Sequence, residues 1–323
     1  MRIVIPDDYQ DCVRGLACFS KLAGHEVVIH NDTVKGTDAL AERFAEADAI
    51  VLTRERTRID AALLARLPRL RIVSQTGKLA GHVDLDACTA RGVVVAEGSG
   101  AGSATAELAW TLAMASRRHL VAEVDAMRRG LWQRHLGQQL GGQRLGVWSY
   151  GRIGRQVAAY GRVFGMKVWV WGRETSTAAA RADGFEVAPS REAFFAGSDV
   201  LSLHVRLGAD TIGLVTAADL DLMKPDALFI NTSRAELVEP QALERALAKG
   251  RPGFAAVDVY EREPVLGEGH PLLKFPNALC TPHIGYVEKD NYERYFGIAF
   301  DNINRFAEGR LTEAANPAAL APR

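Results

Sequence analysis

Short runs of apolar residues alternate with segments of helical periodicity along the whole chain. The apolar runs are rich in β-branched residues and predict strands at 2–5, 26–30, 49–53, 71–76, 92–97, 144–148, 167–171, 199–204, 227–232, 253–259 and 277–283. Parallel strands that helices cover on both faces have this continuously apolar character. The pattern therefore predicts an α/β protein with doubly wound parallel sheets.

Helix boundary signals fall between these runs. Asp60 precedes the segment "AALLARLP", where a capping side chain is expected, and Pro68 ends it. Thr216 with Asp219 three residues later forms a capping-box pattern in front of a further helix. The stretch "YERYFGIAFDNINRFAEG" near the end of the chain also has helical periodicity, and we expect this helix to return to the first domain.

A glycine- and serine-rich bend at 98–103 divides the two series of strands. It leads into a helix that is apolar nearly all round, which predicts burial between larger bodies. At about 150 residues per domain, a chain of 323 residues suggests two domains. We place the first domain at 1–99 with 289–323, and the second at 100–288.

Composition narrows the class of protein. Lysine plus arginine and aspartate plus glutamate both number 39, so no net field favours nucleic acid or an anionic membrane. No apolar run approaches the ~20 residues of a membrane-spanning helix, and "MRIVIPDDYQ" has the pattern of a first strand rather than a signal peptide. The four cysteines form no CxxC pair and no metal-binding spacing. We expect a reduced, cytoplasmic protein that binds no metal.

The stretch "LGVWSYGRIG" approximates the Gly-x-Gly-x-x-Gly turn that binds dinucleotides. A predicted strand precedes it, a predicted helix follows it, and Gly151 and Gly154 fill the second and third glycine positions. Ser149 replaces the first glycine, which we expect to be tolerated if its backbone angles are ordinary. The candidate cofactor-binding residues here are Ser149, Tyr150, Gly151, Arg152, Ile153 and Gly154. The alternative is a strand–helix turn without a ligand.

Ionisable side chains follow three of the later predicted strands. These are Arg234, Asp258 with Glu263, and His283. Ligands of open parallel sheets bind beyond the carboxyl ends of the strands. There an arginine could hold a carboxylate, and a histidine paired with a carboxylate could exchange a proton with a substrate oxygen. The alternatives are a structural histidine and a glutamate that only belongs to the turn before Pro264.

These segments resemble the D-isomer-specific 2-hydroxyacid dehydrogenase family. The resemblance spans essentially the whole chain and rests on "GHVDLDACTARGVVV", "TAELAWTLAMA", "LGVWSYGRIG", "DVLSLHV", "LMKPDALFINTSRAELV", "AAVDVYEREP", "HPLLKFPN" and "TPHIG". It implies a Rossmann cofactor domain inserted in a flavodoxin-like substrate domain. It also implies a homodimer formed through the helix at 103–116 and the arm "MRRGLWQRHLGQQL".

The resemblance also implies roles for individual residues. Arg234 would bind the substrate's carboxylate and carbonyl, His283 would be the acid/base, and Glu263 would pair with His283. Asp258 would hold the nicotinamide amide, with Thr105, His204 and Thr232 as further cofactor-binding residues. The backbone amides of Thr76, Gly77, Lys78 and Leu79 would hold the substrate carboxylate. Departures from the family pattern are Ser149, Arg206, the segment 96–99, and Tyr286 with Val287.

The end of the second strand bears on the cofactor. NAD sites usually place an acid about 20 residues after the glycine turn, but Gly172 and Arg173 stand there. A guanidinium can bind a 2′-phosphate, so the sequence favours NADP(H) over NAD(H). The same Gly-Arg pair resembles NADPH-using members of the family. Against this, Glu174 could reach the ribose, and Arg173 could stack on the adenine.

The leading hypothesis is an enzyme that moves a hydride between a nicotinamide cofactor and a small 2-keto or D-2-hydroxy acid, similar to glyoxylate/hydroxypyruvate reductases. The alternatives are an enzyme similar to phosphoglycerate dehydrogenases and a nucleotide-sensing binding protein of the corepressor type. Arg54, Lys78 and Tyr286 are candidate substrate contacts. If both cations face the substrate, it would carry a second anionic group. Otherwise they are solvated surface charges.

Overall fold

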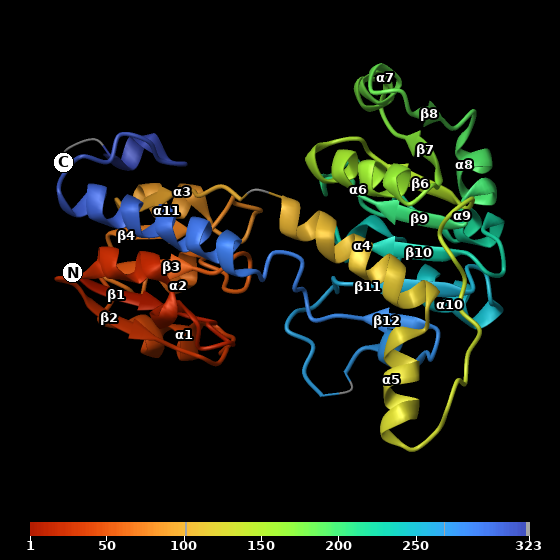
Figure 1. Cartoon of the computed structure of the whole chain (residues 1–323). Coiled ribbons are helices and arrows are strands. Elements are labelled where there is room, and N and C mark those ends of the chain that lie inside the picture. Colours follow the sequence, from red (N-terminus) through yellow and green to blue (C-terminus); the bar gives the residue numbers. More distant parts are fainter. Residues whose placement is uncertain (101, 268, 321–323) are drawn as a thin grey trace. The chain divides into compact units, whose positions relative to one another are not determined.

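A computed structural model describes residues 1–100, 102–267 and 269–320 (Figure 1). The chain divides into two compact units: Met1–Ala101 with Glu288–Arg323, and Gly102–Val287. The second unit is therefore an insertion in the first.

The first unit contains a five-stranded parallel sheet. Its order, β2-β1-β3-β4-β5, is that of flavodoxin-like folds. The strands are β1 (Arg2–Ile5), β2 (Glu26–Ile29), β3 (Ala49–Leu52), β4 (Ile72–Gln75) and β5 (Val94–Ala96).

Helices cover both faces of this sheet. One face packs on α1 (Thr37–Phe44), α2 (Ala61–Leu64) and α3 (Leu85–Ala90). Helix α11 (Lys289–Ala307) packs against β3, β4 and the 3-10 helix η2 (Ala17–Leu22). The Ser74 hydroxyl of β4 donates to the carbonyl of Ala299 in α11 at 2.9 Å. The remaining short 3-10 helices of the unit are η1 (Val13–Gly15) and η5 (Pro317–Leu320).

The second unit contains a seven-stranded parallel sheet. Its order, β12-β11-β10-β9-β6-β7-β8, places β6 next to β9, and the connections change direction between these two strands. The strands are β6 (Arg144–Trp148), β7 (Lys167–Trp171), β8 (Glu186–Val187), β9 (Val200–Leu203), β10 (Leu228–Asn231), β11 (Phe254–Val257) and β12 (Ala278–Cys280).

Two hydrophobic clusters cover the two faces of this sheet. Helices α4 (Ser103–Arg117), α6 (Arg152–Val163) and α7 (Glu174–Ala182) contribute to one, and α8 (Arg191–Gly197), α9 (Ala217–Leu222) and α10 (Ala242–Lys249) to the other. Figure 1 shows α6 beside β6 and α10 near β10 and β11. The unit also has α5 (Leu120–Arg128) and the 3-10 helices η3 (Ala235–Leu237) and η4 (Pro271–Lys274).

The predicted fold class is confirmed by the two parallel sheets. Asp60 caps α2, and Thr216 with Asp219 forms a complete capping box on α9, as expected. Three details were wrong. Helix α2 ends at Leu64, before Pro68; the last strand ends at Cys280, which leaves His283 in a loop; and α5 and β8 were not predicted.

Helix α4 is not buried all round as its composition predicted. Ala106, Ala109 and Ala113 face the core, but Met114 is 42% exposed and Glu107 is exposed. Because alanine and methionine are compatible with both environments, composition alone could not separate the faces. Among the residues that the structure describes, no helix has the length and apolarity that crossing a membrane requires.

Candidate active site

The glycine turn follows β6 and leads into α6. Ser149 has φ +79°, so the condition of ordinary backbone angles is not met: the serine adopts the left-handed conformation that favours glycine. A hydrogen bond from its amide to the carbonyl of Trp171, at 2.7 Å, holds it there. A Cβ at Gly154 would collide with the carbonyl oxygen of Ser149. The turn therefore requires a glycine at 154 and keeps its shape at 149 at the cost of backbone strain.

The N-terminus of α6 has the features of a phosphate cradle. Gly151 is the N-cap, no side chain caps the helix, and a Cβ built on Gly151 meets nothing within 4 Å. Uncapped first-turn amides and the helix dipole favour an anion. Arg152 and Arg155 lie in this first turn, which contains no acidic residue. The residues present thus fit a dinucleotide's pyrophosphate.

Buried polar atoms follow the ends of β9 and β10, two adjacent strands of the same sheet. Both ring nitrogens of His204, after β9, and the hydroxyl of Thr232, after β10, are buried without a hydrogen-bond partner in the described part of the chain. Burial lowers the pKa of His204 to about 4, so its ring is neutral at physiological pH. Buried polar groups are usually satisfied, and a bound cofactor would give these atoms partners.

His283 and Glu263 form a hydrogen-bonded pair at the carboxyl edge of the sheet. The His283 Nδ1 atom lies 2.6 Å from Oε2 of Glu263, and the side chains are 20% and 32% exposed. The other oxygen of Glu263 accepts the Tyr260 amide at 3.0 Å. This arrangement directs Nδ1 toward the carboxylate and leaves Nε2 as the ring nitrogen for a substrate.

Asp258 organises the loop that carries His283. Its carboxylate is buried and accepts hydrogen bonds from the Thr281 hydroxyl at 2.6 Å and from the amides of Ile284 and Gly285 at 2.9 and 2.8 Å. Burial raises the pKa of Asp258, and these hydrogen bonds oppose the rise. Of its roughly four acceptor positions three are occupied, so its main contacts are with its own chain.

Arg234 lies three residues after the end of strand β10 and is the N-cap residue of η3. The side chain of Asn231 holds this bend, because it donates to the Arg234 carbonyl at 2.8 Å and accepts the Ser233 amide at 3.0 Å. The Ser233 hydroxyl donates to the carbonyl of Leu203 in β9 at 2.7 Å. These hydrogen bonds therefore fix the position of the Arg234 backbone, from which its guanidinium extends. Asn231 and Ser233 were not predicted as site residues.

Tyr260 was also missed, although it contacts Glu263 and the loop segment just before His283. Its amide binds Glu263, and its buried hydroxyl donates to the carbonyl of Thr281 at 2.9 Å, two residues before His283. An aromatic residue after a strand is usually a core residue, so the sequence contained no signal for this contact.

Of the remaining predicted residues of the second unit, some contact His283 or its loop and others pack in the hydrophobic core. The Thr105 hydroxyl, in α4, donates to the carbonyl of Gly285 at 2.9 Å. Tyr286 is buried with its ring edge-on to His283, centroids 5.4 Å apart. Tyr150 instead packs in the core, and its hydroxyl donates to Asp183 at 2.9 Å. Ile153 is partly buried against the same core.

At the end of β7, Gly172 precedes Arg173, which is the N-cap of α7. The Arg173 guanidinium forms an ion pair with Asp210, a residue of the loop after β9. Glu174 pairs instead with Arg181 of its own helix at 3.3 Å. A Cβ at Gly172 would lie 3.3 Å from Cβ of Ser176 and 3.5 Å from Cα of Ser149, so this position is crowded.

The loop 76–79 of the first unit was predicted to offer four amides to a carboxylate. Two of them are already used: the Thr76 amide donates to the Leu52 carbonyl at 3.0 Å, and the Leu79 amide donates to Glu97 at 2.8 Å. Within the described residues, the amides of Gly77 and Lys78 have no such acceptor. The expected cradle of four amides is therefore reduced to two.

The two cations near this loop differ. A Cβ at Gly77 would collide with the guanidinium of Arg54, so this cation lies directly against the loop. The Lys78 ammonium is 2.7 Å from Glu97, and its side chain is 71% exposed. Both cations thus have a carboxylate partner, since the Arg54 guanidinium is 3.3 Å from Glu55.

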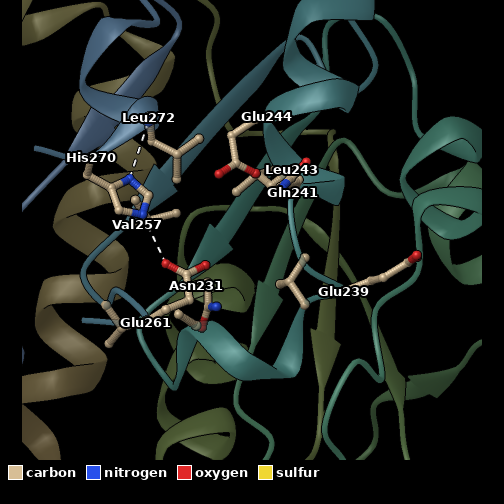
Figure 2. Close-up of a pocket in the computed structure, with 12 residues that line it drawn as sticks. Asn231, Glu239, Gln241, Leu243, Glu244, Val257, Glu261, His270 and Leu272 are labelled. Atoms are coloured by element: carbon tan, nitrogen blue, oxygen red, sulfur yellow. Dashed lines mark hydrogen bonds and ion pairs between the residues drawn. The ribbon is translucent and has the colours of Figure 1, made fainter. Parts of the chain in front are cut away.

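A small pocket of the second unit is lined by residues at and after the ends of β10 and β11 (Figure 2). Val257 and Val259 line it, so it is on the opposite face of this segment from Asp258. The dashed lines in Figure 2 join His270 to Leu272 and to Glu261, whose carboxylate is 3.0 Å from the ring. Asn231 lines the pocket and also donates a hydrogen bond to the Arg234 carbonyl, so the pocket is adjacent to the Arg234 bend.

Comparisons with known proteins agree with this arrangement. The model of the "D-isomer specific 2-hydroxyacid dehydrogenase, NAD binding domain" matches residues 110–285. A glyoxylate reductase from Aeropyrum pernix is 35% identical over 284 residues, 85% of this chain and 84% of the relative.

Two solved structures are more similar still. One is an oxidoreductase from Ralstonia solanacearum whose given name is that of a D-3-phosphoglycerate dehydrogenase. It is 53% identical, with a TM-score of 0.97 over 99% of this chain and 98% of that one. A phosphoglycerate oxidoreductase from Vibrio cholerae is 50% identical, with a TM-score of 0.93 over 95% of this chain and 99% of that one.

The doubly wound sheet with its nucleotide turn and the matching domain model define a nicotinamide-dependent oxidoreductase. The chain belongs to the D-isomer-specific 2-hydroxyacid dehydrogenase family. It acts on the CH–OH group of 2-hydroxy acids or, in the reverse direction, on the corresponding keto group.

Proposed function

We propose that the protein reduces small 2-keto acids of the glyoxylate and hydroxypyruvate type, with His283 as the proton donor. The observation that carries this proposal is the 2.6 Å contact between His283 Nδ1 and Glu263. A carboxylate on Nδ1 stabilises the protonated ring and leaves Nε2 to donate to an oxygen. The relative from Aeropyrum pernix, named a glyoxylate reductase, supports the same substrate class.

The other residues act on the substrate and the cofactor. Arg234 would bind the carboxylate and polarise the keto oxygen, so its charge stabilises the negative charge that grows there. In the first unit, the two remaining amides of the loop 76–79 would bind a carboxylate. Tyr286, edge-on to His283, would limit the size of the group beyond the keto carbon. The reduced nicotinamide, when bound, supplies a hydride.

We assign the cofactor to the second unit. The α6 N-terminus and the turn 149–154 would hold the pyrophosphate, and His204 and Thr232 would find their hydrogen-bond partners on the nicotinamide half. Thr105 and Asp258 would act mainly by shaping the loop 281–285, since both already bond to it. Asp258 retains an acceptor position for the nicotinamide amide.

A turnover screen tests this function. Glyoxylate, hydroxypyruvate, pyruvate, longer 2-keto acids and phosphohydroxypyruvate are offered with NADH and with NADPH. We expect the highest kcat/KM with glyoxylate or hydroxypyruvate. Binding of the nucleotide without turnover of any keto acid would instead favour a sensor of the corepressor type.

A second candidate substrate carries a phosphate. The guanidinium of Arg54 lies against Gly77, beside the amides proposed for the carboxylate, and the Vibrio cholerae relative is named a phosphoglycerate oxidoreductase. If the substrate has a second anionic group, Arg54→Gln raises KM for phosphohydroxypyruvate by about 10-fold or more. The same change leaves KM for hydroxypyruvate within about 2-fold. An equal loss for both substrates assigns Arg54 to the shared carboxylate.

We further propose that NADPH is preferred over NADH. Gly172 removes the carboxylate that would repel a 2′-phosphate, and Arg173 supplies a guanidinium at the N-terminus of α7. Glu174, the competing residue, is engaged with Arg181. The test is the ratio of kcat/KM with NADPH and NADH in the wild type and in Arg173→Ala. A wild type that prefers NADH, or an unchanged ratio in the variant, contradicts this proposal.

We propose a homodimer formed through α5 and the arm that follows it. Large apolar side chains are exposed there: Leu120, Val121, Val124, Met127, Leu131, Trp132 and Leu136. Glu123 fixes the arm, because it accepts the amides of Arg134 and His135 at 3.0 and 2.7 Å. Monomeric proteins rarely expose large contiguous apolar patches, so a cluster of exposed apolar residues close together in sequence supports an interface.

Sedimentation at micromolar concentration tests the homodimer. The wild type is expected to sediment as a dimer and Trp132→Asp as a folded monomer, with Leu266→Asp, an exposed apolar residue outside this surface, as the control. A monomeric wild type contradicts the proposal.

A further inference from the structure

The ion pair between Arg173 and Asp210 joins two segments that flank the nucleotide turn. Arg173 follows β7 and Asp210 lies in the loop after β9, while β6 lies between these two strands in the sheet. The turn 149–154 follows β6. The pair therefore bridges the neighbours of the strand whose turn we assign to the pyrophosphate. Both side chains are exposed, at 77% and 68%, so the pair is accessible to a ligand.

The loop that carries Asp210 holds its shape without the ion pair. Thr211, which is buried, accepts the Gly208 amide on its hydroxyl at 2.8 Å and donates to the Arg206 carbonyl at 2.9 Å. Farther along, the Gly213 amide donates to the carbonyl of Glu236 at 2.8 Å. Asp210 is consequently presented to Arg173 by a folded loop, and a neutral side chain at 210 would occupy the same place.

We propose that Asp210 is a specificity-determining residue that opposes the binding of a 2′-phosphate. This inference rests on the proposed placement of the adenosine ribose beside Arg173. With NADH, the carboxylate can accept a hydrogen bond from the free 2′-hydroxyl while its pair with Arg173 remains. A 2′-phosphate brings a charge of about −1.5 to −2. It must displace the carboxylate from Arg173 or lie next to it.

The size of the effect follows from the exposure of the pair. Exposed ion pairs contribute little, and salt screens charges that are several ångströms apart. Removing the carboxylate is therefore expected to tighten NADPH binding by about 3- to 10-fold rather than by orders of magnitude. The effect should diminish as the salt concentration rises, whereas a change in shape would not respond to salt.

Direct binding measurements on the full chain test Asp210 without relying on turnover. Dissociation constants for NADPH, NADH, adenosine 2′,5′-bisphosphate and adenosine 5′-monophosphate are measured by calorimetry for the wild type, Asp210→Asn and the control Asp221→Asn. Asp221 forms a comparable exposed ion pair with Lys249, at 3.0 Å, elsewhere in the same unit. We expect Asp210→Asn to tighten only the two 2′-phosphorylated ligands, and Asp221→Asn to change none of the four.

The double variant with Arg173→Ala separates this inference from the cofactor proposal. If Asp210 acts through Arg173, its replacement has a smaller effect when Arg173 is absent. An unchanged NADPH affinity in Arg173→Ala overturns the proposed NADPH preference, but a selective gain in Asp210→Asn would still support the role of Asp210. Equal affinities of the wild type and Asp210→Asn for the 2′-phosphorylated ligands, or an equal gain in the Asp221→Asn control, overturn the inference.

Discussion

Glu263 and His283 are joined at 2.6 Å although neither residue lies in a strand or a helix. Their geometry depends on neighbours that are themselves fixed: the Tyr260 amide on Glu263, and Asp258 on the loop after His283. The pair is thus held by hydrogen bonds between two loops at the edge of the sheet, which makes its contribution separable by small substitutions.

His283→Ala is expected to lower kcat by about 10²- to 10⁴-fold, the usual value of general acid catalysis. Cofactor affinity should change little, because the imidazole acts on the substrate oxygen. Steady-state kinetics and a direct titration of the reduced cofactor measure the two effects. Wild-type turnover in the variant would remove His283 from the mechanism.

Glu263→Gln is expected to lower kcat, because the imidazole loses the carboxylate that holds its Nδ1 atom and orients its ring. Glutamine keeps the size of the side chain and an acceptor for the Tyr260 amide. Glu261→Gln is the matched control, since Glu261 contacts the other histidine of this region, His270, at 3.0 Å. Equal kcat values of the Glu263 variant and the wild type would exclude the proposed role of the pair.

Ser149→Gly is expected to raise the free energy of unfolding by about 0.5–1 kcal/mol. Relief of the left-handed strain is worth about 1–2 kcal/mol, and the greater freedom of glycine in the unfolded chain offsets about half of it. Ser149→Ala keeps the strain and serves as the control. Denaturant unfolding compares the three proteins, and equal stability of the glycine and alanine variants would show that φ +79° is not costly here.

The buried His204 predicts a loss of stability in acid. Burial lowers its folded-state pKa to about 4, below an unfolded value of about 6.5. The unfolded chain therefore binds the proton first, and stability is lost as the pH falls from about 6.5 toward 4, by about 3 kcal/mol in total. His204→Phe should lose less stability over this range. Parallel curves of unfolding free energy against pH would contradict this assignment.

Glu97→Ala is expected to raise KM for 2-keto acids by about 2- to 10-fold with little change in kcat, because Glu97 holds the Leu79 amide and the Lys78 ammonium. Lys78→Met removes only the ion pair and should have the smaller effect. A larger increase in KM for Lys78→Met than for Glu97→Ala would show that the Lys78 side chain, rather than the Leu79 amide contact, holds the loop in place.

The sequence predicted the elements that depend on local patterns. Continuous apolar runs identified nearly every strand, and the side chains of Asp60 and Thr216 correctly identified the starts of α2 and α9. The missed elements lack such patterns. Strand β8 has two residues, and α5 exposes Leu120 and Val121, so its apolar residues do not mark a face toward the core.

The sequence predicted the site residues that directly follow strands, but not the residues that hold them in position. Arg234, Asp258 and His283 stand just after apolar runs, where ligands of parallel sheets bind. Asn231, Tyr260 and Glu97 support the site through contacts with residues elsewhere in the chain. These contacts depend on the three-dimensional course of the loops, which the sequence pattern does not show. The backbone of Ser149 likewise depends on the fixed turn between β6 and α6.

The insertion of the second unit in the first has a consequence for synthesis on the ribosome. Helix α11 packs on β4, but the segment Gly102–Val287 must be translated between them. At about 5–20 residues per second, the five-stranded sheet waits roughly 10–40 s for the helix that covers one of its faces. The inserted unit, whose chain is continuous, can fold during that delay. The first unit is therefore the part of the protein that most needs protection from aggregation while it is being made.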